Sequence, residues 1–138
     1  MFDPYKKFSF ENLEVYKAAR NLVKDIYILQ NRFPKEERYA LGDQIRRSAV
    51  SITSNIAEGN GRVSLKEKIR FIEIAYGSMT ESFSQLQIAQ DLGYIEEKDV
   101  EAIRPSFNHV AALLSLLRRK IQQQLSDTPN NLNNPITQ

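Results

Sequence analysis

The chain has 138 residues, a net charge of +2 and 26% charged residues, which is the size of one domain. It has no cysteine, which excludes disulfides and thiolate metal sites and fits a reducing compartment. No apolar run approaches the roughly 20 residues that cross a bilayer, and the N-terminus lacks the apolar stretch of a signal peptide. We therefore expect a cytoplasmic protein with no membrane partner.

The first predicted helix covers about residues 11–31. Its apolar positions from Leu13 to Ile26 recur every three or four residues, as they do on one face of a helix. Ser9 has a side chain typical of an N-cap residue. Phe33-Pro34 is expected to end this segment, because the residue before a proline avoids helical angles.

The second predicted helix begins near Pro34, which suits a first helical turn because it lacks an N–H. It continues to about Glu58, and its core seam consists of Ile45, Ala49, Ile52 and Ile56. Gly59 and Gly61 are expected to end it, because glycine adopts left-handed backbone angles readily.

The third predicted helix follows Ser64, which forms a capping-box pattern with Glu67, and Gly93 ends it after about Leu92. Its seam has long apolar side chains at alternating four and three spacing: Leu65, Ile69, Ile72, Tyr76, Met79, Phe83 and Leu86. The fourth covers about residues 97–125. Pro105 lies inside its apolar pattern and predicts either a kink or the true start of the helix.

Four amphipathic helices joined by short connections predict an all-α fold, an antiparallel up-and-down four-helix bundle. We place this single domain at residues 1–126. Residues 127–138 have little apolar content and two prolines, so they are predicted to form a disordered C-terminal tail.

A second stripe on the predicted second helix is small and polar, about 100° from its core seam. We expect this stripe to meet a similar one on the third helix in a tight contact, either within the bundle or between subunits. The residues predicted for this helix-packing or oligomer interface are Ser48, Ser51, Asn55, Glu58, Ser78, Glu81 and Ser82. The alternative is an ordinary solvated face. Three carboxylates, Glu58, Glu73 and Glu81, are expected to be partly buried. Glu81 is expected to form a salt bridge or a capping contact, with an arginine of the second helix as one candidate partner.

The sequence offers no recognisable set of catalytic residues. His109 is the single histidine, so neither a dimetal bundle site nor a convincing Ser-His-Asp triad is available. The run GNGR lacks the spacing and the lysine of a phosphate-binding loop. We expect no metal, no cofactor and no enzymatic activity.

Basic side chains converge on one end of the predicted bundle. The candidate nucleic-acid-binding residues are Arg62, Lys66, Arg70, Arg118, Arg119 and Lys120, with Lys6 and Lys7 at the same end. Such a cluster would contact phosphates without reading bases. The alternative interpretation is a solvated helix end, where cations offset the helix dipole.

Two stretches carry a family resemblance: QIRRSAVSITSNIAEGNGR, residues 44–62, and FIEIAYGSMTESFSQLQIAQDLGYI, residues 71–95. They resemble the four-helix-bundle family encoded by intervening sequences of bacterial 23S ribosomal RNA genes, over Phe10 to about Leu125. The resemblance implies a pentameric ring. It also implies similarity to the accessory variability protein of diversity-generating retroelements, a basic pentamer that binds reverse transcriptase and nucleic acid.

These observations lead to one functional hypothesis and one alternative. The hypothesis is a non-enzymatic homo-oligomer that binds RNA, DNA or a nucleic-acid-processing protein, such as a reverse transcriptase, through its basic end. The alternative is a protein-interaction scaffold with no role in nucleic-acid binding.

Overall fold

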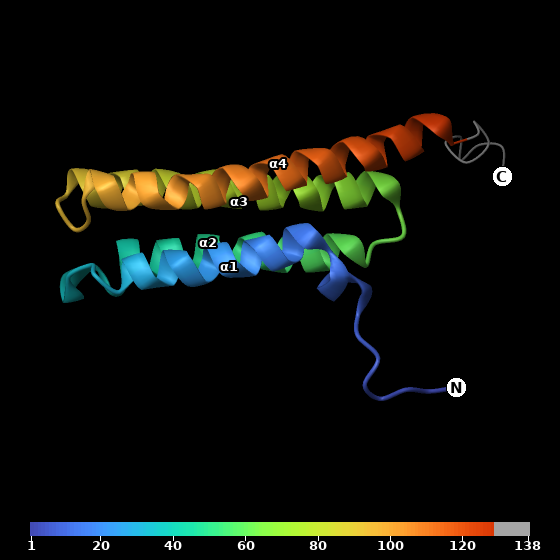
Figure 1. Ribbon diagram of the computed structural model, residues 1–138, viewed down its shortest axis with the longest axis horizontal. Helices are drawn as coiled ribbons and strands as arrows, with labels where there is room; N and C mark the ends of the chain where they lie inside the picture. Colours follow the sequence, from blue (N-terminus) through green and yellow to red (C-terminus); the bar gives the residue numbers. More distant parts are fainter. Residues whose placement is uncertain (129–138) are drawn as a thin grey trace.

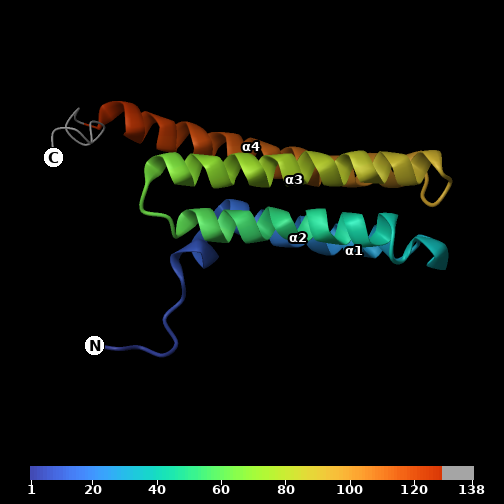
Figure 2. The ribbon, with the colours of Figure 1, turned by 180° about the vertical axis from the view of Figure 1, so that it is seen from behind.

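The computed structural model describes residues 1–128 and contains four α-helices in two layers (Figure 1). Helices α1 (Glu14–Gln30) and α2 (Leu41–Asn60) form one layer, and α3 (Leu65–Asp91) and α4 (Glu97–Asp127) form the other. Each helix contacts the next, and α4 packs back on α1 (Figure 2). The expected all-α up-and-down bundle is confirmed, with no strand among the described residues.

The core runs along the axis of the bundle. The predicted seam of α2 is confirmed, since Ile45, Ala49, Ile52 and Ile56 are all buried. Each of the three isoleucine side chains contributes about 1.5–3 kcal/mol when it is fully buried. Tyr76 differs from the prediction that places it in the seam of α3: it is exposed and lines a surface hollow beside Leu114 and Arg118 of α4.

Both helices of the first layer begin later than predicted. Residues Ser9–Asn12 form a short 3₁₀ helix, η1, so Ser9 is not an N-cap; the carboxylate of Glu11 instead accepts a hydrogen bond from the backbone N–H of Phe8 at 2.8 Å. Residues Lys35–Glu37 form a second 3₁₀ helix, η2. The side chain of Glu37 then accepts a bond from the N–H of Leu41, at the start of α2.

Of the two glycines predicted to end α2, Gly61 does so as the C-cap residue, whereas Gly59 lies inside the helix. Gly59 is buried inside α2, and Gly61 has a φ of −83°, so neither adopts the left-handed angles expected of them. A Cβ at Gly59 would lie 2.6 Å from the Cβ of Phe71. Glycine is therefore required there because α2 and α3 approach each other closely. Gly93, with a φ of +80°, does end α3 as expected.

The remaining helix boundaries follow the sequence pattern more closely. The Ser64 hydroxyl accepts a hydrogen bond from the N–H of Glu67 at 3.3 Å, as predicted for the start of α3. Helix α4 begins before Pro105 and continues through it, so the alternative of a true start at that proline is wrong. It ends at Asp127; the rest of the predicted tail, apart from Thr128, lies outside the described residues.

Candidate nucleic-acid interface and the polar seam between α2 and α3

A buried hydrogen-bonded chain joins α2 to α3. The Ser48 hydroxyl lies 2.8 Å from that of Ser82 and 2.7 Å from Oε1 of Gln85. Since each hydroxyl has one proton, both bonds are made when Ser82 donates to Ser48 and Ser48 donates to Gln85. In this arrangement Ser82 does not donate to its other acceptor, the carbonyl oxygen of Ser78 at 2.9 Å. The Gln85 amide nitrogen then donates to the carboxylate of Glu81 at 3.3 Å. The chain leads from the core to the surface, with Ser82 completely buried.

One turn along, a second polar contact continues the seam. The hydroxyls of Ser51 and Ser78 are 2.8 Å apart. Asn55 donates its amide to both the carbonyl and the hydroxyl of Ser51, at 2.7 and 2.9 Å. Because the side chains are small, the two helices come close enough for hydroxyls to pair directly across the contact.

The small polar stripe is therefore covered by the same chain. Ser48 and Ser51 of α2 pair with Ser82 and Ser78 of α3, and Asn55 bonds to Ser51 within α2. Of the two alternatives for these serines, the structure therefore favours a contact within the bundle.

The three carboxylates expected to be partly buried are exposed instead, which corrects that prediction. Glu58 forms an ion pair with Arg62 at 3.6 Å, and Glu73 pairs with Arg118. Glu81 accepts its bond from Gln85 and has no arginine partner among the described residues. Their positions follow from helix periodicity, because each lies outside the stripe that faces the neighbouring helix.

The up-and-down order brings one set of helix ends together. The starts of α1 and α3 and the finishes of α2 and α4 share one end of the bundle (Figures 1 and 2). We call this end the basic pole and define it by its cationic residues: Lys6, Lys7, Arg62, Lys66, Arg70, Arg118, Arg119 and Lys120. The opposite end contains η2 and the connection between α3 and α4.

Half of the six predicted nucleic-acid-binding residues are already engaged within the chain. Arg62, Arg70 and Arg118 form ion pairs with Glu58, Glu67 and Glu73. The guanidinium groups of Arg62 and Arg70 also lie 4.7 and 5.5 Å from the centre of the Phe71 ring. These arginines contribute less to the binding of an external anion, because contacts within the chain already neutralise part of their charge.

The other three predicted residues have no ionic or hydrogen-bond partner among residues 1–128. They are Lys66, Arg119 and Lys120, and all three are exposed. The structure places Lys66 in the first turn of α3 and the other two near the finish of α4. Exposed cations without partners are the groups that exchange counterions for phosphates at least cost.

Sequence reasoning missed a lysine with a structural role at the basic pole. The ammonium group of Lys68 donates a hydrogen bond to the carbonyl oxygen of Asn60 at 2.8 Å. That carbonyl belongs to the last residue of α2, where helical acceptors lack intrahelical donors. In the sequence, this role is marked only by a lysine eight residues after the end of a helix. Such a spacing is too common to predict the contact.

Two polar contacts tie the loops together at the opposite end. The Tyr94 hydroxyl donates to the carboxylate of Glu37 at 2.7 Å, and this bond, with one from the Leu41 N–H, lowers the pKa of Glu37. Arg32 lies 3.0 Å from Asp99, and its hydrogen bond lowers the pKa of that carboxyl group. Both carboxylates therefore stabilise the fold in their ionised forms.

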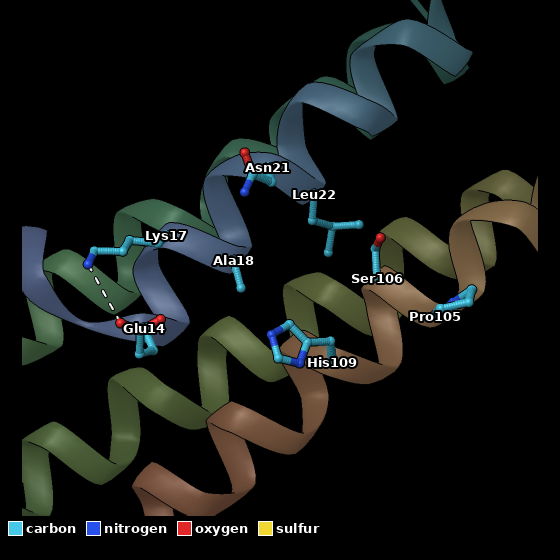
Figure 3. A pocket seen from close by; sticks show the side chains of 8 residues that line it. All are labelled: Glu14, Lys17, Ala18, Asn21, Leu22, Pro105, Ser106 and His109. Atoms are coloured by element: carbon cyan, nitrogen blue, oxygen red, sulfur yellow. Dashed lines mark ion pairs between the residues drawn. The ribbon is translucent and has the colours of Figure 1, made fainter.

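An open groove of about 400 Å³ lies between α1 and α4 (Figure 3). His109 projects into the space between the two helices, opposite Ala18, while Glu14 and Lys17 form an ion pair on the α1 side. His109 is exposed. Within residues 1–128, no three side chains of His, Cys, Asp or Glu are arranged to hold a metal ion.

The fold and its charge distribution define a class of protein: a four-helix bundle with a sealed polar seam and a basic end. None of the helices in the described part of the chain has the length and apolar character to cross a bilayer. Residues 11–116 match the model of the family described as 23S rRNA-intervening sequence protein. The chain belongs to this family, and the resemblance of its SNIAEG and AYGSMTE runs is confirmed.

A solved structure shares the fold. It is a protein of unknown function from the S23 ribosomal protein family of Bacteroides thetaiotaomicron VPI-5482. The two chains are 24% identical, the match covers 76% of this chain and 95% of the other, and the TM-score is 0.69. No curated protein gives a significant match. Neither description names an enzymatic activity.

Proposed function

We propose that the protein is a non-enzymatic, self-associating bundle that holds the phosphate backbone of nucleic acid on its basic pole. The observation that carries this proposal is the set of three exposed, unpaired cations, Lys66, Arg119 and Lys120, at one end of the molecule. Lys6 and Lys7 are exposed at the same end. Side chains of this kind bind phosphates through charge and give little base specificity.

Self-association strengthens this binding, because several basic poles then act on one strand. The chain's net charge of +2 is small for a dedicated monomeric binder. Joining weak sites raises the overall affinity through effective concentration, with no new contact to each phosphate. A ring that presents its basic poles on one face would therefore bind a strand that a single copy holds weakly.

Fluorescence anisotropy with labelled single-stranded RNA and duplex DNA tests the proposal. We expect binding at low salt that weakens as salt rises. The double reversal Arg119→Glu with Lys120→Glu should reduce affinity by about tenfold or more, because it replaces attraction to phosphate with repulsion.

The matched control is Lys24→Glu with Lys35→Glu, which makes the same charge change at exposed sites away from the basic pole. This control should bind almost as the unmodified chain does. Equal losses in both variants would show that net charge, not the basic pole, governs binding. No binding to either nucleic acid at low salt would favour the alternative of a protein-interaction scaffold.

A further inference from the structure

The N-terminal segment, residues 1–8, carries aromatic side chains that its own bundle does not cover. Phe2 is 86% exposed, Tyr5 90% and Phe8 70%. The segment extends away from both helix layers in each view of the ribbon (Figures 1 and 2). Three exposed aromatic residues within one short segment indicate an interaction surface, since each buries a large area when a partner covers it. We call this segment the aromatic arm.

The base of the aromatic arm is fixed to the bundle. Phe8 stacks on Phe10 with ring centres 5.8 Å apart, and Phe10 packs edge-on against Tyr16 at 4.9 Å. The amide of Asn60 donates to the Ser9 hydroxyl at 2.7 Å. The arm therefore leaves the bundle at a defined point and in a direction that carries Phe2 and Tyr5 away from their own core.

The groove between α1 and α4 has the dimensions to receive such an arm. A second hollow, lined by Asp25, Leu29 and Ile103 among others, adjoins the first and shares Ser106 with it. The two extend along α1 from Glu14 to Leu29, which is roughly 22 Å at 1.5 Å per helical residue. In the structure the stretch from Phe2 to Phe8 contains a turn, in which the Lys6 N–H donates to the Asp3 carbonyl oxygen. If this turn opens and the stretch is fully extended, it covers roughly 20 Å.

The chemistry of the groove also matches the aromatic arm. Its floor has apolar side chains, including Ala18, Leu22 and Ile103. Its charged lining consists of Glu14, Asp25 and Asp99 against Lys17. Glu14 pairs with Lys17 and Asp99 with Arg32, but Asp25 has no ion-pair partner among the described residues. The arm brings two adjacent lysines and one aspartate, so opposite charges meet.

We propose that the aromatic arm of one copy lies in the groove between α1 and α4 of a second copy. Tyr5 and Phe2 cover the apolar floor, and Lys6 and Lys7 face the carboxylate of Asp25. In the assembled protein these two lysines are therefore withdrawn from the basic pole, and phosphate binding is left to Lys66, Arg119 and Lys120. This inference rests on the self-association in the proposed function and identifies the surfaces that produce it. It assigns the subunit contact to an exchanged segment, since the small polar stripe of α2 is already covered.

Because the chain has no cysteine, an engineered pair reports on this contact directly. We would mix a tagged Tyr5→Cys variant with an untagged His109→Cys variant under mild oxidation. The expected product is a covalent heterodimer on a non-reducing gel, because a disulfide forms only when the two Cα atoms come within about 7 Å. The matched control replaces His109→Cys with Ser84→Cys, an exposed position on α3.

A heterodimer yield no higher than that of the Ser84→Cys control would overturn the proposal. A single chain that carries both Tyr5→Cys and His109→Cys supplies a further check. An internal bridge that leaves it monomeric would show that the arm folds onto its own groove, which also contradicts an exchange between copies.

Light scattering separates this inference from the proposed function. The double variant Phe2→Ser with Tyr5→Ser should lower the solution mass of the full chain while its helical circular dichroism stays unchanged. If the unmodified chain is an oligomer and the variant keeps its mass, the arm is not the contact, although self-association stands. A monomeric unmodified chain would overturn both.

Discussion

The close packing of α2 against α3 at Gly59 and Phe71 gives a prediction that the chain's other glycines can control. A Cβ at Gly59 would lie 2.6 Å from the Cβ of Phe71, about 1 Å short of ordinary carbon contact. The Phe71 Cβ is attached to the backbone of α3 and has no rotamer that moves it away. Gly59→Ala must therefore separate the helices, at a cost of about 1–3 kcal/mol in the free energy of unfolding.

The same substitution at Gly77 should have the opposite effect. Gly77 lies in the middle of α3, and a Cβ there meets no atom within 4 Å. Alanine favours a helix by about 1 kcal/mol over glycine, so Gly77→Ala should stabilise the fold. The two variants should differ by about 2–4 kcal/mol, or on the order of 10 °C in melting temperature for a chain of this size.

Thermal unfolding followed by circular dichroism, at one fixed protein concentration, measures both effects. Gly59→Ala should melt below the unmodified chain and Gly77→Ala above it. If Gly59→Ala were neutral or stabilising, the close helix contact at this point would be refuted. The glycine would then be explained by its place near the end of α2.

Three further predictions concern the polar seam, the far end of the bundle and the basic pole. Ser48→Ala leaves two buried partners with one fewer hydrogen bond and should cost about 1–3 kcal/mol in chemical denaturation, whereas the exposed Ser84→Ala should change stability by at most about 0.5 kcal/mol. The hydrogen bond from Tyr94 holds the pKa of Glu37 below its ordinary 4.5, so its contribution is complete above that pH and is lost as pH falls through the lowered pKa. Glu37→Gln should therefore flatten the acid limb of a stability–pH profile, and an unchanged limb would contradict the role of this contact. At the basic pole, three unpaired cations predict the slope of log affinity against log salt concentration: about −2 for single strands and about −3 for duplex DNA per engaged subunit. A slope near zero in an anisotropy titration would exclude phosphate binding.

The sequence pattern predicts most of the fold because helix periodicity is local. The isoleucines of α2 recur at helical spacing and are buried as expected. The starts of α1 and α2 were harder to predict, because each is preceded by a 3₁₀ turn. In each turn a glutamate side chain, Glu11 or Glu37, accepts a hydrogen bond from a backbone N–H. A helix-period pattern continues through such a turn, so its spacing does not mark where the α-helix begins.

Contacts between helices explain what the sequence did not reveal about the candidate site. The pattern identified Ser48 and Ser51 as a helix contact but left open whether the partner was α3 or another subunit. The role of Gly59 depends on its distance from Phe71, which no local spacing contains. Likewise, the clustering of basic residues was predicted from helix order, but their pairing with Glu58, Glu67 and Glu73 required the positions of side chains.

Size-exclusion chromatography with multi-angle light scattering, with single-stranded RNA titrated in at low salt, tests the central claim most directly. We expect the free protein to elute as a multiple of 15.9 kDa. Added RNA should then shift it to a heavier complex that dissociates as salt is raised. A particle of 15.9 kDa that elutes apart from the RNA would contradict both the self-association and the binding of nucleic acid.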